Sequence, residues 1–180
     1  SQTNSCLFFF FLTVTIHSDS WATLNSSQTP YSTAPKTTKE GGETIEDAFE
    51  ISALPFFDTG STCDNVDDYY EICPFGGCPM PDVVYSWVST VEGSVFVDLC
   101  GSTFDTQVYM YNENLDLIAC NDDFYSSGSC LPYVSALEDV SVSVGMSYFI
   151  VVDGNCECGD YVISVEEILP ITPCTVSCPS

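Results

Sequence analysis

From residue 43 onward, the chain is a series of short segments in which apolar and polar residues alternate, separated by turns rich in Gly, Asn and Asp. In one segment, Tyr161, Ile163 and Val165 face one way, and Val162, Ser164 and Glu166 face the other. A period of two is typical of a half-buried β-strand, and no segment has a convincing helical period. We therefore expect an all-β fold, a jelly-roll-like β-sandwich of about eight strands, formed by residues 45–51, 83–89, 94–100, 106–111, 115–119, 133–144, 147–152 and 161–167.

Composition divides the 180 residues into four parts. Residues 1–22 form an apolar arm, and residues 23–42 form a linker in which Ser, Thr and Pro occupy half of the positions. Such a linker favours extended, O-glycosylated chain and could reach on the order of 65 Å. The sandwich is expected over residues 43–168, with an irregular loop at 58–80, and residues 169–180 form a tail containing Pro and Cys.

Six stretches of the sandwich region resemble the bacterial pre-peptidase C-terminal domain, a jelly-roll-like β-sandwich of secreted proteins. They are residues 42–48 (GETIEDA), 81–87 (PDVVYSW), 99–106 (LCGSTFDT), 119–123 (ACNDD), 148–154 (YFIVVDG) and 159–161 (GDY). Their order and spacing match the family pattern over residues 42–167. The resemblance implies a secreted accessory domain, and it includes neither the arm nor a catalytic peptidase domain.

The arm is the most apolar part of the chain. Its unbroken apolar run covers residues 6–12, far short of the roughly 20 residues that a membrane-spanning helix needs. Apolar and polar positions alternate from residue 12 to residue 17, as in a β-strand. We therefore expect an extended N-terminal strand that needs a sheet to pair with, formed by Leu7, Phe8, Phe9, Phe10, Phe11, Leu12, Val14 and Ile16.

A secretory signal peptide is the alternative interpretation of the arm. Ser20, Trp21 and Ala22 have the small-x-small pattern of a cleavage site. A signal peptide carries a basic region before its apolar segment, whereas no Lys or Arg precedes Lys36. The missing basic region favours the strand.

Eleven cysteines indicate a disulfide-rich chain from an oxidising compartment, since a pair of C-x-x-C motifs or a Cys/His set for zinc is missing. Cys6 lies in the arm and is the odd one. Local bridges Cys120–Cys130 and Cys174–Cys178 are plausible. The disulfide-forming set is expected to be Cys63, Cys73, Cys78, Cys100, Cys120, Cys130, Cys156, Cys158, Cys174 and Cys178.

The charge balance excludes whole classes of partner. The chain has 26 acidic residues, no Arg, and only Lys36 and Lys39 as fixed cations, giving a net charge of −24. Nucleic-acid binding is excluded because phosphate contacts need Lys and Arg. Anionic membranes are unattractive for the same reason, whereas divalent cations would relieve the repulsion between carboxylates.

Acidic residues at predicted strand ends suggest a calcium site. Ca²⁺ prefers hard oxygen ligands, and the candidates are Asp82, Asp105, Asn121, Asp122 and Asp123. The alternative is that these side chains cap turns by accepting hydrogen bonds from backbone N–H groups. The family resemblance additionally implies Glu43, Glu46 and Asp47 as calcium ligands.

Catalysis has little support in the sequence. His17 is the only histidine and lies in the apolar arm, and cysteines in a disulfide-rich chain make poor nucleophiles. A pair of carboxylates could serve glycoside hydrolysis, but such pairs arise by chance among so many acids. We expect no enzyme.

The arm, linker and sandwich together predict an extracellular structural subunit. In donor-strand complementation, an extended segment of one subunit completes the sheet of the next. We expect a head-to-tail homopolymer, a filament or fibre at the cell surface, with glycans as further partners and Asn25 as a glycosylation acceptor. The alternatives are a secreted accessory domain that binds polysaccharide or protein, and an arm that folds back onto its own sandwich.

Overall fold

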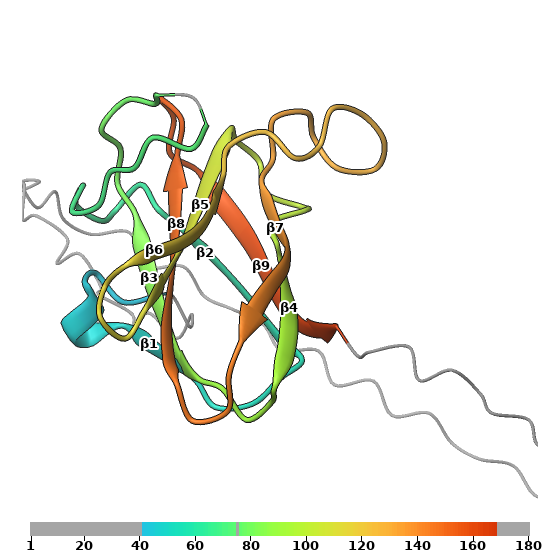
Figure 1. The fold of residues 1–180 in the computed structure, drawn as a ribbon. Coiled ribbons are helices and arrows are strands. Elements are labelled where there is room, and N and C mark those ends of the chain that lie inside the picture. The colour runs from blue at the N-terminus through green and yellow to red at the C-terminus, as the bar shows by residue number, and fades with distance from the viewer. Residues whose placement is uncertain (1–40, 75, 169–180) are drawn as a thin grey trace, which may run out of the picture. The chain divides into compact units, whose positions relative to one another are not determined.

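A computed structural model describes residues 41–74 and 76–168, which form two facing β-sheets (Figure 1). All paired neighbours are antiparallel except β1, which is parallel to β3. Sheet A has the order β1 (Phe49–Ile51), β3 (Val83–Val88), β8 (Ser147–Gly154), β5 (Thr106–Asn112) and β6 (Leu117–Asn121). Sheet B has the order β2 (Phe56–Ser61), β9 (Asp160–Ile168), β4 (Gly93–Asp98) and β7 (Ala136–Val142). The predicted β-sandwich is confirmed.

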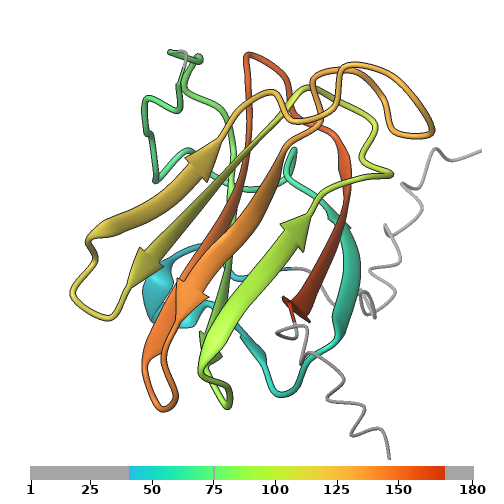
Figure 2. The same cartoon turned by 45° about the vertical axis from the view of Figure 1, so that its right-hand side comes forward.

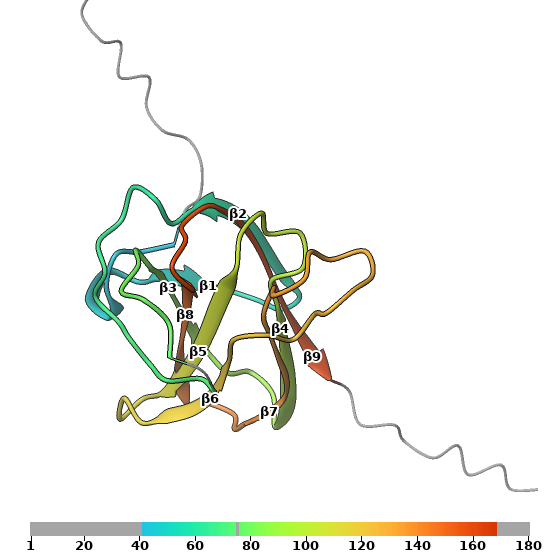
Figure 3. The same cartoon turned by 90° about the horizontal axis from the view of Figure 1, so that it is seen from above.

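The main core lies between the sheets, which are seen from above in Figure 3. Tyr161, Ile163 and Val165 of β9 all point into it, as their alternation predicts. β5 differs because it is buried on both faces from Thr106 to Tyr111. Its second face belongs to a smaller apolar cluster on the outside of sheet A.

Several strand boundaries differ from the sequence prediction. Residues 45–51 are not one strand, because Ile45–Asp47 form a 3₁₀ turn (η1) and only β1 follows as a strand. Asp47 starts this turn by accepting hydrogen bonds from the backbone N–H and the hydroxyl of Thr44. The strand expected at 115–119 begins two residues later, because Leu115 has φ 62° in the turn between β5 and β6. The strand expected at 133–144 is β7, which is shorter at both ends.

The loop expected at residues 58–80 is wrong at its start, because β2 continues to Ser61. Asp58 and Gly60 break the apolar alternation of this strand. Asp58 is buried but accepts a hydrogen bond from the Tyr85 hydroxyl, at 3.2 Å. A Cβ at Gly60 would lie 2.5 Å from the Tyr161 hydroxyl, so glycine is required there. Because a polar residue points inward, this strand lacks the alternation of apolar and polar residues by which a strand is predicted.

The rest of this loop covers the outer face of sheet A and is fixed by disulfides. Cys73 is buried in the cluster that also contains Val84, Tyr109, Tyr111 and Val151. The predicted pair Cys120–Cys130 is wrong, because the two residues bond to partners far away in sequence. The described disulfides are Cys63–Cys158, Cys73–Cys120, Cys78–Cys156 and Cys100–Cys130.

Several predictions lie outside the described residues. These are the arm strand, its signal-peptide alternative, Cys6, His17, the glycosylation acceptor Asn25, and the Cys174–Cys178 bridge. Gly42, assigned to the linker, pairs with Val84 of β3 through two backbone hydrogen bonds of 2.8 and 2.9 Å. Among the described residues, no helix has the length and apolarity needed to cross a membrane.

Candidate functional site

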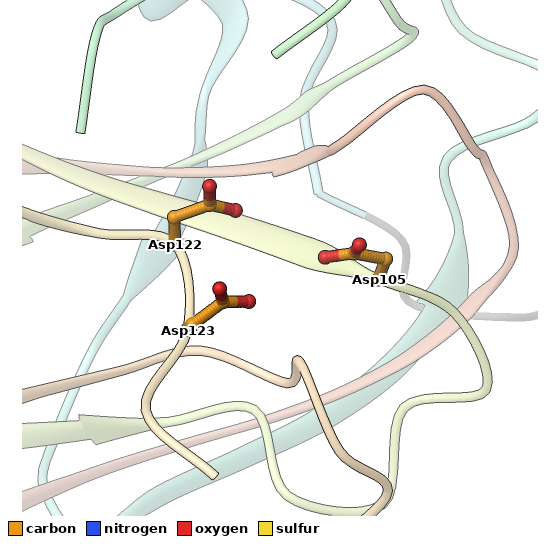
Figure 4. Close-up of side chains that lie close together, drawn as sticks. All are labelled: Asp105, Asp122 and Asp123. Atoms are coloured by element: carbon orange, nitrogen blue, oxygen red, sulfur yellow. The ribbon is translucent and has the colours of Figure 1, made fainter. Parts of the chain in front are cut away.

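Three carboxylates meet at one end of sheet A. Asp105 immediately precedes β5, and Asp122 and Asp123 immediately follow β6, which pairs with β5. One carboxylate oxygen from each residue lies within 4.8 Å of the others. Figure 4 shows Asp105 and Asp122 pointing toward one another, with Asp123 beside them. Hairpin pairing therefore brings together residues that are distant in the sequence, as the predicted calcium site requires.

The burial of these side chains is uneven. Asp122 is fully buried, Asp105 is half-buried and Asp123 is exposed. Neither carboxylate oxygen of Asp122, nor Oδ1 of Asp105, has a hydrogen-bond partner among the described residues. Buried polar atoms normally have such partners, so these orphaned oxygens call for an explanation.

Electrostatics at the cluster oppose full ionisation. Burial, followed by the charges of Asp122, Asp123 and Glu157, raises the pKa of Asp105 to about 6. Burial also raises the pKa of Asp122, an effect that the neighbouring Gln107 side chain opposes. The alternative role as turn caps does not describe Asp122, whose carboxylate accepts no hydrogen bond of normal geometry from the described residues.

The other predicted calcium ligands lie outside this cluster or have other partners. Asp82 accepts hydrogen bonds from the backbone N–H groups of Asp68 and Tyr69, both at 2.9 Å, and so anchors the loop over sheet A. Asn121 accepts a long hydrogen bond of 3.4 Å from the Ala136 N–H. Of the ligands implied by the family resemblance, Glu43 accepts from the Val66 N–H and Asp47 caps η1. Glu46 is exposed.

Sequence reasoning missed a buried polar network next to the cluster. The Tyr109 hydroxyl lies 2.6 Å from Oδ2 of Asp153 and 2.7 Å from Oε1 of Gln107. One hydroxyl proton cannot serve two acceptors, but a protonated Asp153 could donate to Tyr109, which then donates to Gln107. Burial raises the pKa of Asp153 to about 7, which agrees with this arrangement. The only sequence signal was two polar residues, Gln107 and Asp153, within apolar strands.

Stability is expected to fall as pH rises, because Asp153 holds its proton to higher pH in the folded state. Its pKa is about 7 in the folded protein, against 3.8 for an unperturbed aspartic acid, so the folded protein binds more protons between these limits. Asp82, with its pKa also raised to about 7 by burial, acts in the same direction. In EDTA, Asp153→Asn should melt at a higher temperature than the wild type at pH 8, and the gain should be clearly smaller at pH 5, because it disappears only below the unfolded pKa of 3.8.

The control for this prediction is Glu50→Gln, which removes the same charge from an exposed position on β1. Thermal melts followed by circular dichroism at both pH values compare the three proteins. Equal pH dependence of Asp153→Asn and the wild type would show that Asp153 is already ionised when folded.

β6 of sheet A and β7 of sheet B lie side by side at one edge of the sandwich (Figures 2 and 3). Residues of both strands line a groove at this edge. It has a volume of about 690 Å³, and a second hollow of about 280 Å³ adjoins it and shares three of its lining residues. Its apolar lining is Ile118, Ala119, Val140, Met146 and Tyr148, and Glu138 and Asp139 form its acidic wall.

Each of the two strands has a register shift at this groove. Ile118 has no partner in the register of β5 with β6, and Glu138 and Asp139 together face one residue of β4. A bulge bends its strand and interrupts regular pairing. Ile118 is consequently 38% exposed at the edge, where its side chain lines the groove.

At the opposite edge of the sandwich, between β1 and β2, aromatic side chains bridge the two sheets. The rings of Phe49 of β1 and Phe56 of β2 have centroids 6.1 Å apart, and each also contacts the ring of Tyr85, at 5.8 and 5.6 Å. The two edges therefore differ, and the β6–β7 edge offers the groove.

The chain was compared with known proteins. No protein-family model matches it, and no curated protein is significantly similar in sequence.

Proposed function

We propose that the protein is a structural subunit of an extracellular filament or surface fibre. In this proposal, the N-terminal arm of one copy adds as a strand to the β6–β7 groove of the next. The groove carries the proposal, because it is a hollow with apolar and acidic lining between two sheet edges, in a sandwich whose opposite edge is bridged by aromatic side chains. Strand addition supplies backbone hydrogen bonds from the edge and pockets for alternate side chains.

The distribution of charge favours the arm, rather than another sandwich, as the segment that binds in the groove. A sandwich in which all charged residues after position 40 are acidic repels another sandwich, and Glu138 and Asp139 line the groove itself. Such edge acids discourage chance pairing between strands. The first 18 residues contain no acidic side chain, so the arm can approach without repulsion.

The apolar residues of the arm match the groove in character. Burying each of several Phe side chains would contribute about 1.5–3 kcal/mol, enough for a lasting joint. The groove offers Val140 and Tyr148, which are largely buried, and the exposed surfaces of Ile118 and Met146 as contact partners.

The described chain begins away from the groove. Gly42 pairs with β3, whereas β6 lies on the other side of β8 and β5 in sheet A. The linker, with a reach of about 65 Å, is long enough for insertion into the same sandwich or into a second copy, so the oligomeric state separates the two. Insertion into a neighbour is a heterologous contact, which extends into a filament unless it closes into a ring.

Disulfides support an extracellular setting. Four bridges link segments 30 to 95 residues apart in the described chain. Bridges of this kind persist in oxidising compartments such as the extracellular space.

A complementation experiment tests the proposal. Full-length protein should polymerise, as seen by electron microscopy and light scattering. Deletion of residues 1–22 removes the arm and leaves the groove, whereas Ile118→Asp blocks the groove and leaves the arm. Each variant alone should be monomeric, and a mixture of the two should form one-to-one heterodimers and nothing longer.

Leu131→Asp is the matched control, because Leu131 is 50% exposed and lies outside the groove. This variant should polymerise like the wild type. Monomeric full-length protein would overturn the proposal and indicate an arm folded onto its own sandwich. A secreted chain that starts near Thr23 would also overturn it and would favour a secreted accessory binding domain.

A further inference from the structure

The carboxylates of Asp105, Asp122 and Asp123 face one another in a part of the chain that supplies no counter-charge. Residues 41–180 contain no Lys, Arg or His, so no side chain of the sandwich can neutralise them. Asp122 is fully buried, and neither of its carboxylate oxygens has a hydrogen bond of normal geometry among the described residues. The Gln107 side chain lies beside it, and its Nε2 also lacks a partner of normal geometry within the described chain. A buried carboxylate with no opposite charge beside it is costly, so a cation between these groups would stabilise the fold.

The dimensions of the cluster fit a hard divalent cation. Calcium binds oxygen ligands at about 2.3–2.6 Å, so two ligands on opposite sides of the ion lie at most about 5 Å apart. The three carboxylate oxygens lie within 4.8 Å of one another without any rearrangement. Asp123 is exposed, which leaves a route for the ion and room for water ligands.

The donor atoms exclude softer metals. Zinc and copper favour thiolate and imidazole ligands. The eight cysteines among the described residues are all in disulfides, and histidine does not occur after residue 17. Carboxylates and water are the ligands that calcium and magnesium take, and calcium tolerates the irregular geometry of a loop better than magnesium does.

We propose that Asp105, Asp122 and Asp123 bind one divalent cation of the Ca²⁺ class, which fastens the connection between β6 and β7 to the start of β5. This connection, residues 122–135, is the gold loop at the upper right of Figure 1. Hydrogen bonds join the two ends of this loop, which we call its neck. The Phe124 and Tyr125 N–H groups donate to the Val134 carbonyl. The Ser135 hydroxyl contacts the Asp122 carbonyl. The ion adds a link from this neck to the Asp105 side chain.

Calcium titration of the EDTA-treated full-length protein tests the site. Calorimetry at pH 7.5 and 0.15 M NaCl should show one calcium ion per chain, with magnesium binding at least about tenfold more weakly. Calcium should raise the melting temperature and slow amide hydrogen exchange within residues 122–135.

Two variants separate ion binding from general effects of charge. Asp122→Asn should abolish the binding heat. Without calcium, it should melt above the wild type, because it removes a buried unpaired charge; with calcium, this order should reverse. Asp123→Asn, at an exposed position, should keep the fold and weaken calcium binding at least about tenfold. Glu113→Gln is the control, since it removes one charge from an exposed turn outside the cluster and should bind calcium like the wild type.

Three results would overturn the proposal. They are the absence of binding heat and melting shift at millimolar calcium, unaltered calcium binding by Asp122→Asn, and an equal melting shift with magnesium, which would indicate general screening. Each readout uses the metal alone, so the outcome does not depend on whether the protein forms filaments.

Discussion

Replacing Trp87 by alanine is expected to lower the free energy of unfolding by about 3–5 kcal/mol, because a large buried side chain leaves a cavity that the core cannot fill. Trp87 lies in β3 and is 2% exposed. It pairs in register with Tyr148 of β8, and the two rings have centroids 5.9 Å apart. On its other side it pairs with Ile51 of β1. The substitution therefore removes contacts to both neighbouring strands of sheet A.

Val88→Ala is the matched control for this prediction. Val88 is the next residue of β3, points to the opposite face and is 53% exposed. Its truncation should change stability by no more than about 0.5 kcal/mol. Urea unfolding followed by circular dichroism gives both values at one pH. Similar losses for the two variants would contradict the assignment of the inward and outward faces of β3.

Removing the Cys73–Cys120 disulfide, by Cys73→Ala with Cys120→Ala, is expected to cost about 2–5 kcal/mol. The bond fixes the loop over the outer face of sheet A, where Cys73 packs with Tyr109, Tyr111 and Val151. Loss of the bond raises the conformational entropy of the unfolded chain. It also weakens the packing of the smaller apolar cluster on the outside of sheet A. The effect is measured by chemical unfolding, and limited proteolysis within residues 62–82 reports the loosening directly.

Removal of Cys63–Cys158 provides a comparison that separates the two causes. This bond spans 95 residues against 47 for Cys73–Cys120, so chain entropy alone makes it the more stabilising by about 0.6 kcal/mol. Cys63 is exposed and its partner Cys158 is half-buried, whereas Cys73 is only 1% exposed. We expect the loss of Cys73–Cys120 to cost more, because packing within the outer apolar cluster adds to entropy there. If the loss of Cys63–Cys158 costs more instead, the disulfides stabilise the protein mainly by restricting the unfolded chain.

Local pattern predicted most of the strands because their inward positions are apolar. The alternation over 161–167 and the apolar run over 147–152 correspond to β9 and β8, the latter central in sheet A. β2 was missed because Asp58 points inward and Gly60 lies against Tyr161. Both exceptions depend on Tyr85 and Tyr161, which belong to strands far away in sequence.

The candidate metal ligands were partly recognisable from their positions at strand ends. Asp105 and the pair Asp122 and Asp123 flank β5 and β6, so hairpin pairing alone brings them together. Asp82 also stands at a strand end, but it is used to hold the loop over sheet A. The sequence could not separate these roles, because the difference lies in which backbone N–H groups come within hydrogen-bond distance.

The amino-acid sequence by itself determined the all-β class, the disulfide-rich character and the absence of cations from the sandwich, since these follow from local periodicity and composition. Only the tertiary structure decided which cysteines pair, which strand edge is open and which carboxylate is buried without a partner. Cys120 illustrates the reason: it bonds to Cys73, 47 residues away, rather than to Cys130, ten residues along the chain. Such choices depend on which segments the fold places side by side, and sequence separation does not determine that.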